Sequence, residues 1–344
     1  NVPVAILGLV AVASLVPESR AGLRPGFDVP GVLSSSAGLA VLTYGFIQAG
    51  QHGWASGGAV APIVVGMGIL LGFLAWQRAL WRRPEGQPLI DVSLFRSGAF
   101  TWGSVLFAVL TMALVGLLFT LPQYFQAVMG TDAEGSGIRL LPVVGGLLMG
   151  LVPAPLIAKR LGAKLTTATG FGILAADLAL GATTSVRSGE AFSALCLWGA
   201  GVGAGLTMAT VASGALAEMS EERAGVGSAV LQALKNTGAP LGSAVLGSVL
   251  TSGYRTNLHL GGLPAGLAEE ARQGVFQGVS VARGVGAPAL LASVRSAFVH
   301  GMDATFLAAL GFALAGAMIA LALLPNVRAV RQPRTGRRRE HVVA

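Results

Sequence analysis

The sequence predicts an all-α polytopic membrane protein, for three reasons. Hydrophobic residues make up 53% of the 344 residues and charged residues 11%, with a mean hydropathy of +0.71, whereas soluble domains carry about 25% charged residues. Several apolar runs are long enough to cross a bilayer, where only a helix satisfies its own backbone hydrogen bonds within one segment. The 50 glycines suit the close approach of helices in lipid.

Two apolar runs between Thr101 and Leu161 are the clearest example of such membrane-spanning segments. The first, TWGSVLFAVLTMALVGLLFTLPQYFQAVM, has no charged residue, and GTDAEGSG joins it to LLPVVGGLLMGLVPAPLIA. The second run ends in a basic cluster from Lys159 to Lys164. Polar residues at one end and cations at the other predict a membrane hairpin with a defined orientation.

Nine apolar segments are predicted to span the membrane: 1–16, 31–50, 59–77, 99–127, 140–158, 165–185, 191–217, 225–251 and 304–325. Of the 23 lysines and arginines, sixteen fall in one set of alternate loops and six in the other. The larger set holds Arg20, Arg24, Arg78, Arg82, Arg83, Arg96, Lys159, Arg160, Lys164, Arg223 and six arginines of the tail 326–344. The positive-inside rule therefore predicts a multi-pass protein of the cell membrane with a cytoplasmic C-terminus. Residues 252–302 are predicted to form an external amphipathic hairpin or a partly re-entrant loop.

Composition also excludes several classes of protein. The net charge is +8, but the sequence contains no folded basic domain that could form a nucleic-acid-binding surface. One cysteine and four scattered histidines supply neither a disulfide framework nor a metal motif, so no cofactor or metal is expected. The glycine pairs lie within apolar runs without a preceding strand, which argues against a nucleotide-binding loop. The expected partners are the lipid bilayer, a small molecule and protons.

An ordered set of short motifs resembles the fourteen-span drug:proton antiporters of the major facilitator superfamily. In chain order these are NVPV, PES, DVPG, PLIDVSLFRSGAF, LPQYFQAVMGTDAEGSGIRLLP, AKRLGAK, RAGVGSAVLQALKNTGAPLG and SAFVHGMD. The resemblance implies that residues 1–16 end the sixth span and that 17–98 hold two extra spans and a cytoplasmic linker. It also implies that residues 99–325 form the C-terminal six-helix bundle. On this expectation the N-terminal half is missing, and residues 1–344 alone do not transport.

The same resemblance implies a cytoplasmic gating loop around the motif AKRLGAK. Its candidate residues are Lys159, Arg160, Gly162 and Lys164. The acidic residue of the family's gating motif is not found in this stretch. Gly162 and the cations match the family's pattern at the corresponding place in the C-terminal half.

Three ionisable residues within or beside the predicted spans are candidates for proton coupling, because charges in lipid are costly and generally functional. Asp177 lies near the predicted midplane and either couples protons or hydrogen-bonds a neighbouring helix. Asp303 is either an external acid for proton entry or a helix-start residue favoured by the helix dipole. Lys235 either takes part in transport, paired with Asp177 or an acid elsewhere, or is structural.

Two polar groups are candidates for lining a substrate cavity. Gln123, Tyr124 and Gln126 follow Pro122 and either line an outer mouth or anchor the span at the interface. Gln232 and Asn236 accompany Lys235 in the segment 225–251. Glycine pairs, Gly68/Gly72, Gly146/Gly150 and Gly238/Gly242 with the series at 199–205, are predicted as packing faces.

The predicted spans and buried acids favour secondary active transport by alternating access. The resemblance implies that this transport is proton-coupled efflux of hydrophobic or cationic drugs or antiseptics. One alternative is an exporter of a dedicated metabolite such as an antibiotic made by the same cell. A membrane enzyme or non-transporting scaffold is the other, and the short loops without clustered histidines and acids argue against it.

Overall fold

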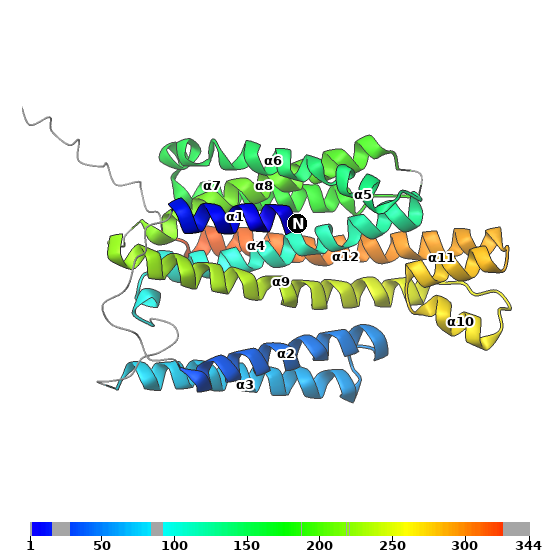
Figure 1. Cartoon of the computed structure of the whole chain (residues 1–344), viewed down its shortest axis with the longest axis horizontal. Coiled ribbons are helices and arrows are strands. Elements are labelled where there is room, and N and C mark those ends of the chain that lie inside the picture. Colours follow the sequence, from blue (N-terminus) through cyan, green and yellow to red (C-terminus); the bar gives the residue numbers. More distant parts are fainter. Residues whose placement is uncertain are drawn as a thin grey trace, which may run out of the picture.

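The computed structural model describes residues 2–15, 28–83, 92–186, 188–217, 219 and 221–325. Within these ranges the regular secondary structure is entirely helical, with no strand. The long helices lie roughly parallel to the long axis of the molecule and form one bundle, with a separate hairpin alongside (Figure 1).

Five helices among the described residues are long and apolar enough to cross a membrane. They are α2 (Val29–His52), α3 (Gly57–Trp81), α4 (Gly98–Gln123) with its continuation η2 (Tyr124–Val128), α8 (Glu190–Leu216) and α12 (Pro288–Leu323). A bent pair adds a sixth candidate, with 70° between Ala133–Leu151 and Ala154–Gly181. These lengths fit a polytopic membrane protein.

The remaining helices account for the other predicted segments. They are α1 (Val2–Leu15), η1 (Val92–Arg96), α5 (Ala133–Arg139), α6 (Leu141–Leu151), α7 (Ala154–Gly181), α9 (Glu221–Asn257), α10 (Ala265–Arg272) and α11 (Val275–Gly284). The apolar helix α1 has only 14 residues, and α9 is 37 residues long but is not among the five because polar residues lower its hydropathy. The count of nine spans therefore stays a prediction.

Gly162 interrupts α7 between the predicted segments 140–158 and 165–185. Its φ of 85° and ψ of 158° are not helical. A positive φ of this size is strained for a residue with a β-carbon, so glycine is required where the chain turns here. The residue that the sequence assigned to a gating loop thus has a definite conformational role.

Backbone contacts at glycines hold α6, α8 and α7 together as a layer. A β-carbon at Gly146 or Gly150 of α6 would overlap a backbone carbonyl oxygen of α8, and one at Gly201 or Gly205 of α8 would overlap a carbonyl of α6. On the α7 side, a β-carbon at Gly203 would lie 2.6 Å from the carbonyl oxygen of Gly170. The glycine series at 199–205 of α8 therefore packs against two helices, since alternate glycines face α6 and α7.

The α4–α9 contact uses a second glycine pair, as predicted. β-carbons at Gly238 and Gly242 would lie 2.6 Å from the Ala108 carbonyl oxygen and 2.7 Å from the Met112 Cα. The prediction for Gly68 and Gly72 is wrong within the described structure, because no atom lies within 4 Å of a β-carbon at either position. The neighbouring turn of α3 packs instead through Gly66, whose β-carbon would lie 2.6 Å from the Leu42 nitrogen of α2.

The α2–α3 hairpin begins at a buried acid. Asp28 caps α2 by accepting a hydrogen bond from the Gly31 amide at 2.9 Å, and Pro30 follows in the first turn. The same carboxylate accepts hydrogen bonds from Trp76 Nε1 at 3.2 Å and Gln77 Nε2 at 2.6 Å, both on α3. One side chain therefore caps a helix and joins the two helices of the hairpin.

The predicted loop 252–302 is mostly helical. The segments with helical periodicity form α10, α11 and the first turns of α12. Tyr254 at the end of α9 donates a hydrogen bond to the Ala271 carbonyl at 2.8 Å. These elements lie at the same end of the bundle as the α2–α3 turn, opposite the start of α9 (Figure 1). Several sequence predictions lie outside the described residues. They are the tail 326–344, Arg20, Arg24 and the part of the cytoplasmic linker at 84–91, together with the side chain of Arg223.

Candidate functional site

A polar turn of α9 gathers three of the residues singled out from the sequence. Gln232, Lys235 and Asn236 are spaced three and four residues apart and so lie on neighbouring positions of one helix face. Gln232 and Asn236 are exposed, and Lys235 is partly buried with its Nζ 5.5 Å from the centroid of the Phe107 ring on α4. A cation–π contact therefore holds the lysine against the bundle.

Asp177 lies elsewhere, in the contact between α7 and α8. It is 7% exposed, and a β-carbon at Gly199 would overlap its Oδ1. The buried Oδ2 has no hydrogen-bond partner among the described groups. An unsatisfied oxygen in a packed interface is costly, and a proton or a polar partner would relieve that cost.

The pairing of Lys235 with Asp177 that the sequence left open is not found. The described residues form no ion pair between them. Lys235 contacts α4, whereas Asp177 faces α8, so the two side chains lie in different helix–helix interfaces. The tertiary arrangement therefore keeps apart two groups that the sequence alone allows to meet.

Asp303 is not a helix-start acid. The helix α12 begins at Pro288, so Asp303 lies about four turns inside it, whereas the dipole effect is confined to the first turn. Its Oδ1 is buried without a hydrogen-bond partner among the described groups. The helix-start alternative for Asp303 is wrong because the polar stretch before the last apolar segment is itself helical and belongs to α12.

The aromatic and polar end of α4 packs inward. After Pro122 the helix widens into the π-helical turn η2, and Tyr124 has no exposed surface. Its hydroxyl donates a hydrogen bond to the Ser185 carbonyl at 3.0 Å. This bond joins the end of α4 to the connection that follows α7. Gln123 and Gln126 are partly exposed, and Gln123 Nε2 donates to the Phe119 carbonyl of its own helix at 3.0 Å. In this conformation Tyr124 is therefore a core residue.

The basic residues around Gly162 remain accessible. Lys159 and Arg160 are exposed and Lys164 is partly exposed. None of the three forms an ion pair with a described residue. Their positions are compatible with a contact surface at this end of the bundle.

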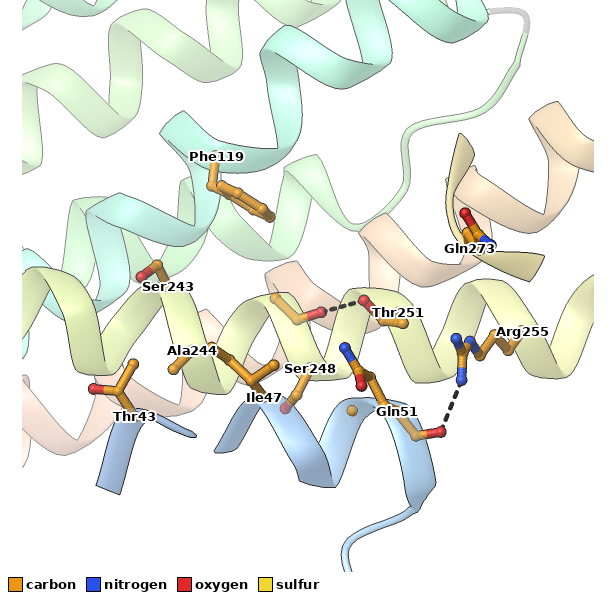
Figure 2. Close-up of a pocket in the computed structure, with 12 residues that line it drawn as sticks. Thr43, Ile47, Gln51, Phe119, Ser243, Ala244, Ser248, Thr251, Arg255 and Gln273 are labelled. Carbon is orange, nitrogen blue, oxygen red and sulfur yellow. Dashed lines mark hydrogen bonds between the residues drawn. The ribbon is translucent and has the colours of Figure 1, made fainter. Parts of the chain in front are cut away.

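A pocket of about 310 Å³, not predicted from the sequence, lies between α2, α4 and α9 (Figure 2). Residues that line it include Thr43, Gln51, Phe119, Ser243, Thr251 and Arg255. Arg255 spans the pocket's end, donating to the Gln51 carbonyl at 2.7 Å and the Arg272 carbonyl at 3.2 Å. Gln51, Arg255 and Arg272 are far apart in sequence, so the sequence did not predict this pocket. The only local signal is the four-residue spacing of Ser243, Gly247, Thr251 and Arg255, which places them on one face of α9.

Similar proteins are named as exporters and resistance proteins. The chain is 29% identical to a tetracenomycin C resistance and export protein of Streptomyces glaucescens, over 93% of the chain and 61% of that relative. It is 29% identical to a probable actinorhodin transporter of Streptomyces coelicolor, over 72% of the chain and 43% of the relative. A lincomycin resistance protein of Listeria innocua is 25% identical over 88% of the chain and 59% of its own length. The chain thus spans about half the length of the curated relatives that it matches, and no family model matches it.

Proposed function

We propose that the chain is part of a secondary active transporter of the major facilitator superfamily that exports hydrophobic or cationic drugs in exchange for protons. The observation that carries this proposal is the alignment of 93% of the chain with a protein named for antibiotic resistance and export. The all-helical bundle with at least five membrane-length helices supports it. Fourteen spans, an N-terminal partner bundle, the cell membrane and a cytoplasmic C-terminus belong to the same proposal.

The packing suggests how the chain contributes to alternating access. The glycine contacts of α6, α7 and α8 make a layer suited to moving as one body against a partner bundle. The exposed polar residues Gln232 and Asn236 of α9, beside Lys235, are available to contact substrate or that partner. Protons and substrate shift the equilibrium between states only if each binds one state more tightly.

Proton coupling is assigned to Asp177 as the leading candidate, with Asp303 as the second. Asp177 is the more buried of the two, and each has a carboxylate oxygen without a partner among the described groups. A buried acid lacking a fixed partner can exchange a proton when water gains access to it. Lys235 is assigned to substrate contact in this proposal, because its cation–π partner leaves it beside the polar turn of α9.

The test is ethidium efflux from vesicles carrying the protein expressed from its complete coding region, with and without an uncoupler. We expect uncoupler-sensitive efflux for the wild type and its loss in Asp177→Asn, which removes the exchangeable proton at nearly constant volume. Glu134→Gln is the matched control, because Glu134 is an exposed acid on α5. Efflux that survives in Asp177→Asn would remove the coupling role but keep the transporter. Absence of uncoupler-sensitive efflux for every substrate tested contradicts the proposal.

Export of a self-made antibiotic is the second candidate function. Two of the relatives are named for tetracenomycin C and actinorhodin. Resistance to one such antibiotic, without resistance to ethidium, would favour the dedicated exporter. Resistance to several unrelated compounds would favour multidrug efflux.

A further inference from the structure

The α2–α3 hairpin and α9 enclose a wedge that narrows toward one end of the bundle. The two meet where a β-carbon at Gly50 of α2 would lie 2.6 Å from the Ser248 Cα of α9. Toward the opposite end the hairpin diverges from α9 (Figure 1). At that wider end, α3 and η1 line two adjoining pockets, and α9 also lines the larger one.

The larger pocket is apolar and measures about 530 Å³. Its lining includes Phe73, Leu74 and Ala75 of α3, Phe95 of η1 and Leu234 of α9. In a membrane-spanning protein, apolar space between helices at this depth is suited to a hydrocarbon chain, because no backbone polar group there needs water. The interior of the wedge therefore fits an acyl chain.

The smaller pocket, about 380 Å³, is cationic and aromatic and shares Arg78 and Phe95 with the first. Arg96 lies over the Trp81 ring, with its guanidinium carbon 4.9 Å from the centroid. Among the residues that the structure describes, neither Arg78 nor Arg96 has an ion-pair partner. Two guanidinium groups beside a tryptophan at a helix end suit a phosphate group at the membrane interface.

We propose that this wedge binds one anionic phospholipid, with its phosphate on Arg78 and Arg96 and an acyl chain along Phe73, Leu74 and Leu234. The order of the groups along α3 fits this ligand, because Phe73 and Trp81 are eight residues, or roughly 12 Å, apart along the helix. Basic pockets between membrane helices at the cytoplasmic face bind anionic headgroups. The positive-inside rule puts this end of α3 at that face.

The lipid would complete the contact between the hairpin and the bundle. The most extensive described contact between the hairpin and the bundle is that of α2 with α9, while α3 packs on η1 by a much smaller contact. A bound lipid would fill the space between α3 and α9 and stabilise the hairpin's position. This inference does not depend on which substrate the protein transports.

The experiment is native mass spectrometry of the purified protein, released from detergent micelles after incubation with defined lipids. Dioleoylphosphatidylglycerol is compared with dioleoylphosphatidylcholine, which has the same chains and no net charge. We expect the wild type to retain phosphatidylglycerol preferentially. Because a basic residue near an anionic lipid contributes about fivefold in affinity, Arg78→Gln with Arg96→Gln should weaken retention about 25-fold. Arg82→Gln, which changes an exposed arginine outside both pockets, should retain the lipid as the wild type does.

Two further arms separate the lipid from other occupants. Ala75→Trp fills the apolar pocket from an exposed position of α3 and should reduce retention although both arginines remain. Glycerol phosphate tests for a simple phosphate site, and protection from thermal unfolding equal to that by the lipid would overturn the proposal. Equal retention of the two lipids, unchanged retention in the double arginine variant, or no retained lipid would also overturn it. These readouts do not involve transport, so their failure is distinct from failure of the proposed efflux function.

Discussion

The layer of α6, α7 and α8 and the α2–α3 hairpin attach to the rest of the protein in different ways. In the layer, glycines on each helix place backbone against backbone, with overlaps expected for β-carbons at Gly146, Gly150, Gly201 and Gly205. The hairpin packs closely within itself but meets the bundle mainly along α9, with Gly50 as the closest glycine approach. Both regions contain apolar helices of membrane length, α8 in the layer and α2 and α3 in the hairpin, so composition alone does not distinguish them.

The difference shows that helix length and hydropathy do not determine how firmly a span is held. Helices in lipid associate through close packing and interhelical hydrogen bonds, because lipid is as apolar as the side chains. The layer has the close packing at many positions. The hairpin also packs closely within itself, as at Gly66, but it joins the bundle mainly through α2 against α9, at Gly50, and through the Arg255–Gln51 bond at its end. We therefore expect the layer to unfold with the whole bundle and the hairpin to separate first.

The largest effect is expected from Gly146→Val in the α6–α8 contact. The side chain would overlap the Trp198 carbonyl, and because backbone cannot easily move, the cost should reach at least about 3 kcal/mol. Thermal unfolding in detergent should show a much lower midpoint or no folded, monodisperse protein. Gly145→Val is the control, since no atom lies within 4 Å of a β-carbon there. Equal loss in both variants would mean that valine in α6, and not the contact, is responsible.

Asp28→Ala should have the next largest effect, but within the hairpin. The change removes the helix cap and the acceptor for Trp76 and Gln77, at a cost of about 1–3 kcal/mol. Hydrogen exchange should rise in α2 and α3 and stay constant in α6 and α8. Uniformly faster exchange throughout the bundle would contradict a separately held hairpin.

Gly50→Ala should loosen the hairpin from α9 by a smaller amount. A β-carbon would lie 2.6 Å from the Ser248 Cα, and a shift of the loosely held hairpin can relieve part of the overlap, so about 1 kcal/mol is expected. Limited proteolysis between α2 and α3 should become faster. The matched control is Gly58→Ala, which meets no atom within 4 Å. A change as severe as Gly146→Val would show that the hairpin is integral to the bundle.

The smallest effect is expected from Arg139→Gln, which removes the ion pair with Glu190 between α5 and α8. The side chains of Arg139 and Glu190 are 28% and 60% exposed, so the pair should contribute only about 0.2–1 kcal/mol. High salt should reduce even this difference in thermal unfolding, because it screens exposed charges. A loss as large as that in the glycine contacts would contradict the view that backbone packing dominates in the layer.

Much of the α-helical organisation could be predicted from particular residues. Asp28 and Pro30 are residue types typical of a helix start, as found in α2. The Gly238/Gly242 pair marked a helix contact, and Gly162 lies in the predicted connection between two apolar segments, where α7 is interrupted. The candidate site was less predictable. Tyr124 proved to be a core residue, and Asp303 lies inside a long helix, because burial and helix start depend on neighbours distant in the chain.

Hydropathy and helix length are local properties of the chain, so the residues alone predict that it is helical and apolar enough to span a membrane. Which glycines carry contacts depends on the folded arrangement, since Gly146 meets a backbone while Gly68 meets no described atom within 4 Å. The same arrangement turns Asp177 toward α8 and Lys235 toward Phe107, and makes α3 and α9 enclose a wedge beside two arginines. Hydropathy measures a preference for lipid, whereas contacts between helices depend on shape and on the direction each face takes in the bundle.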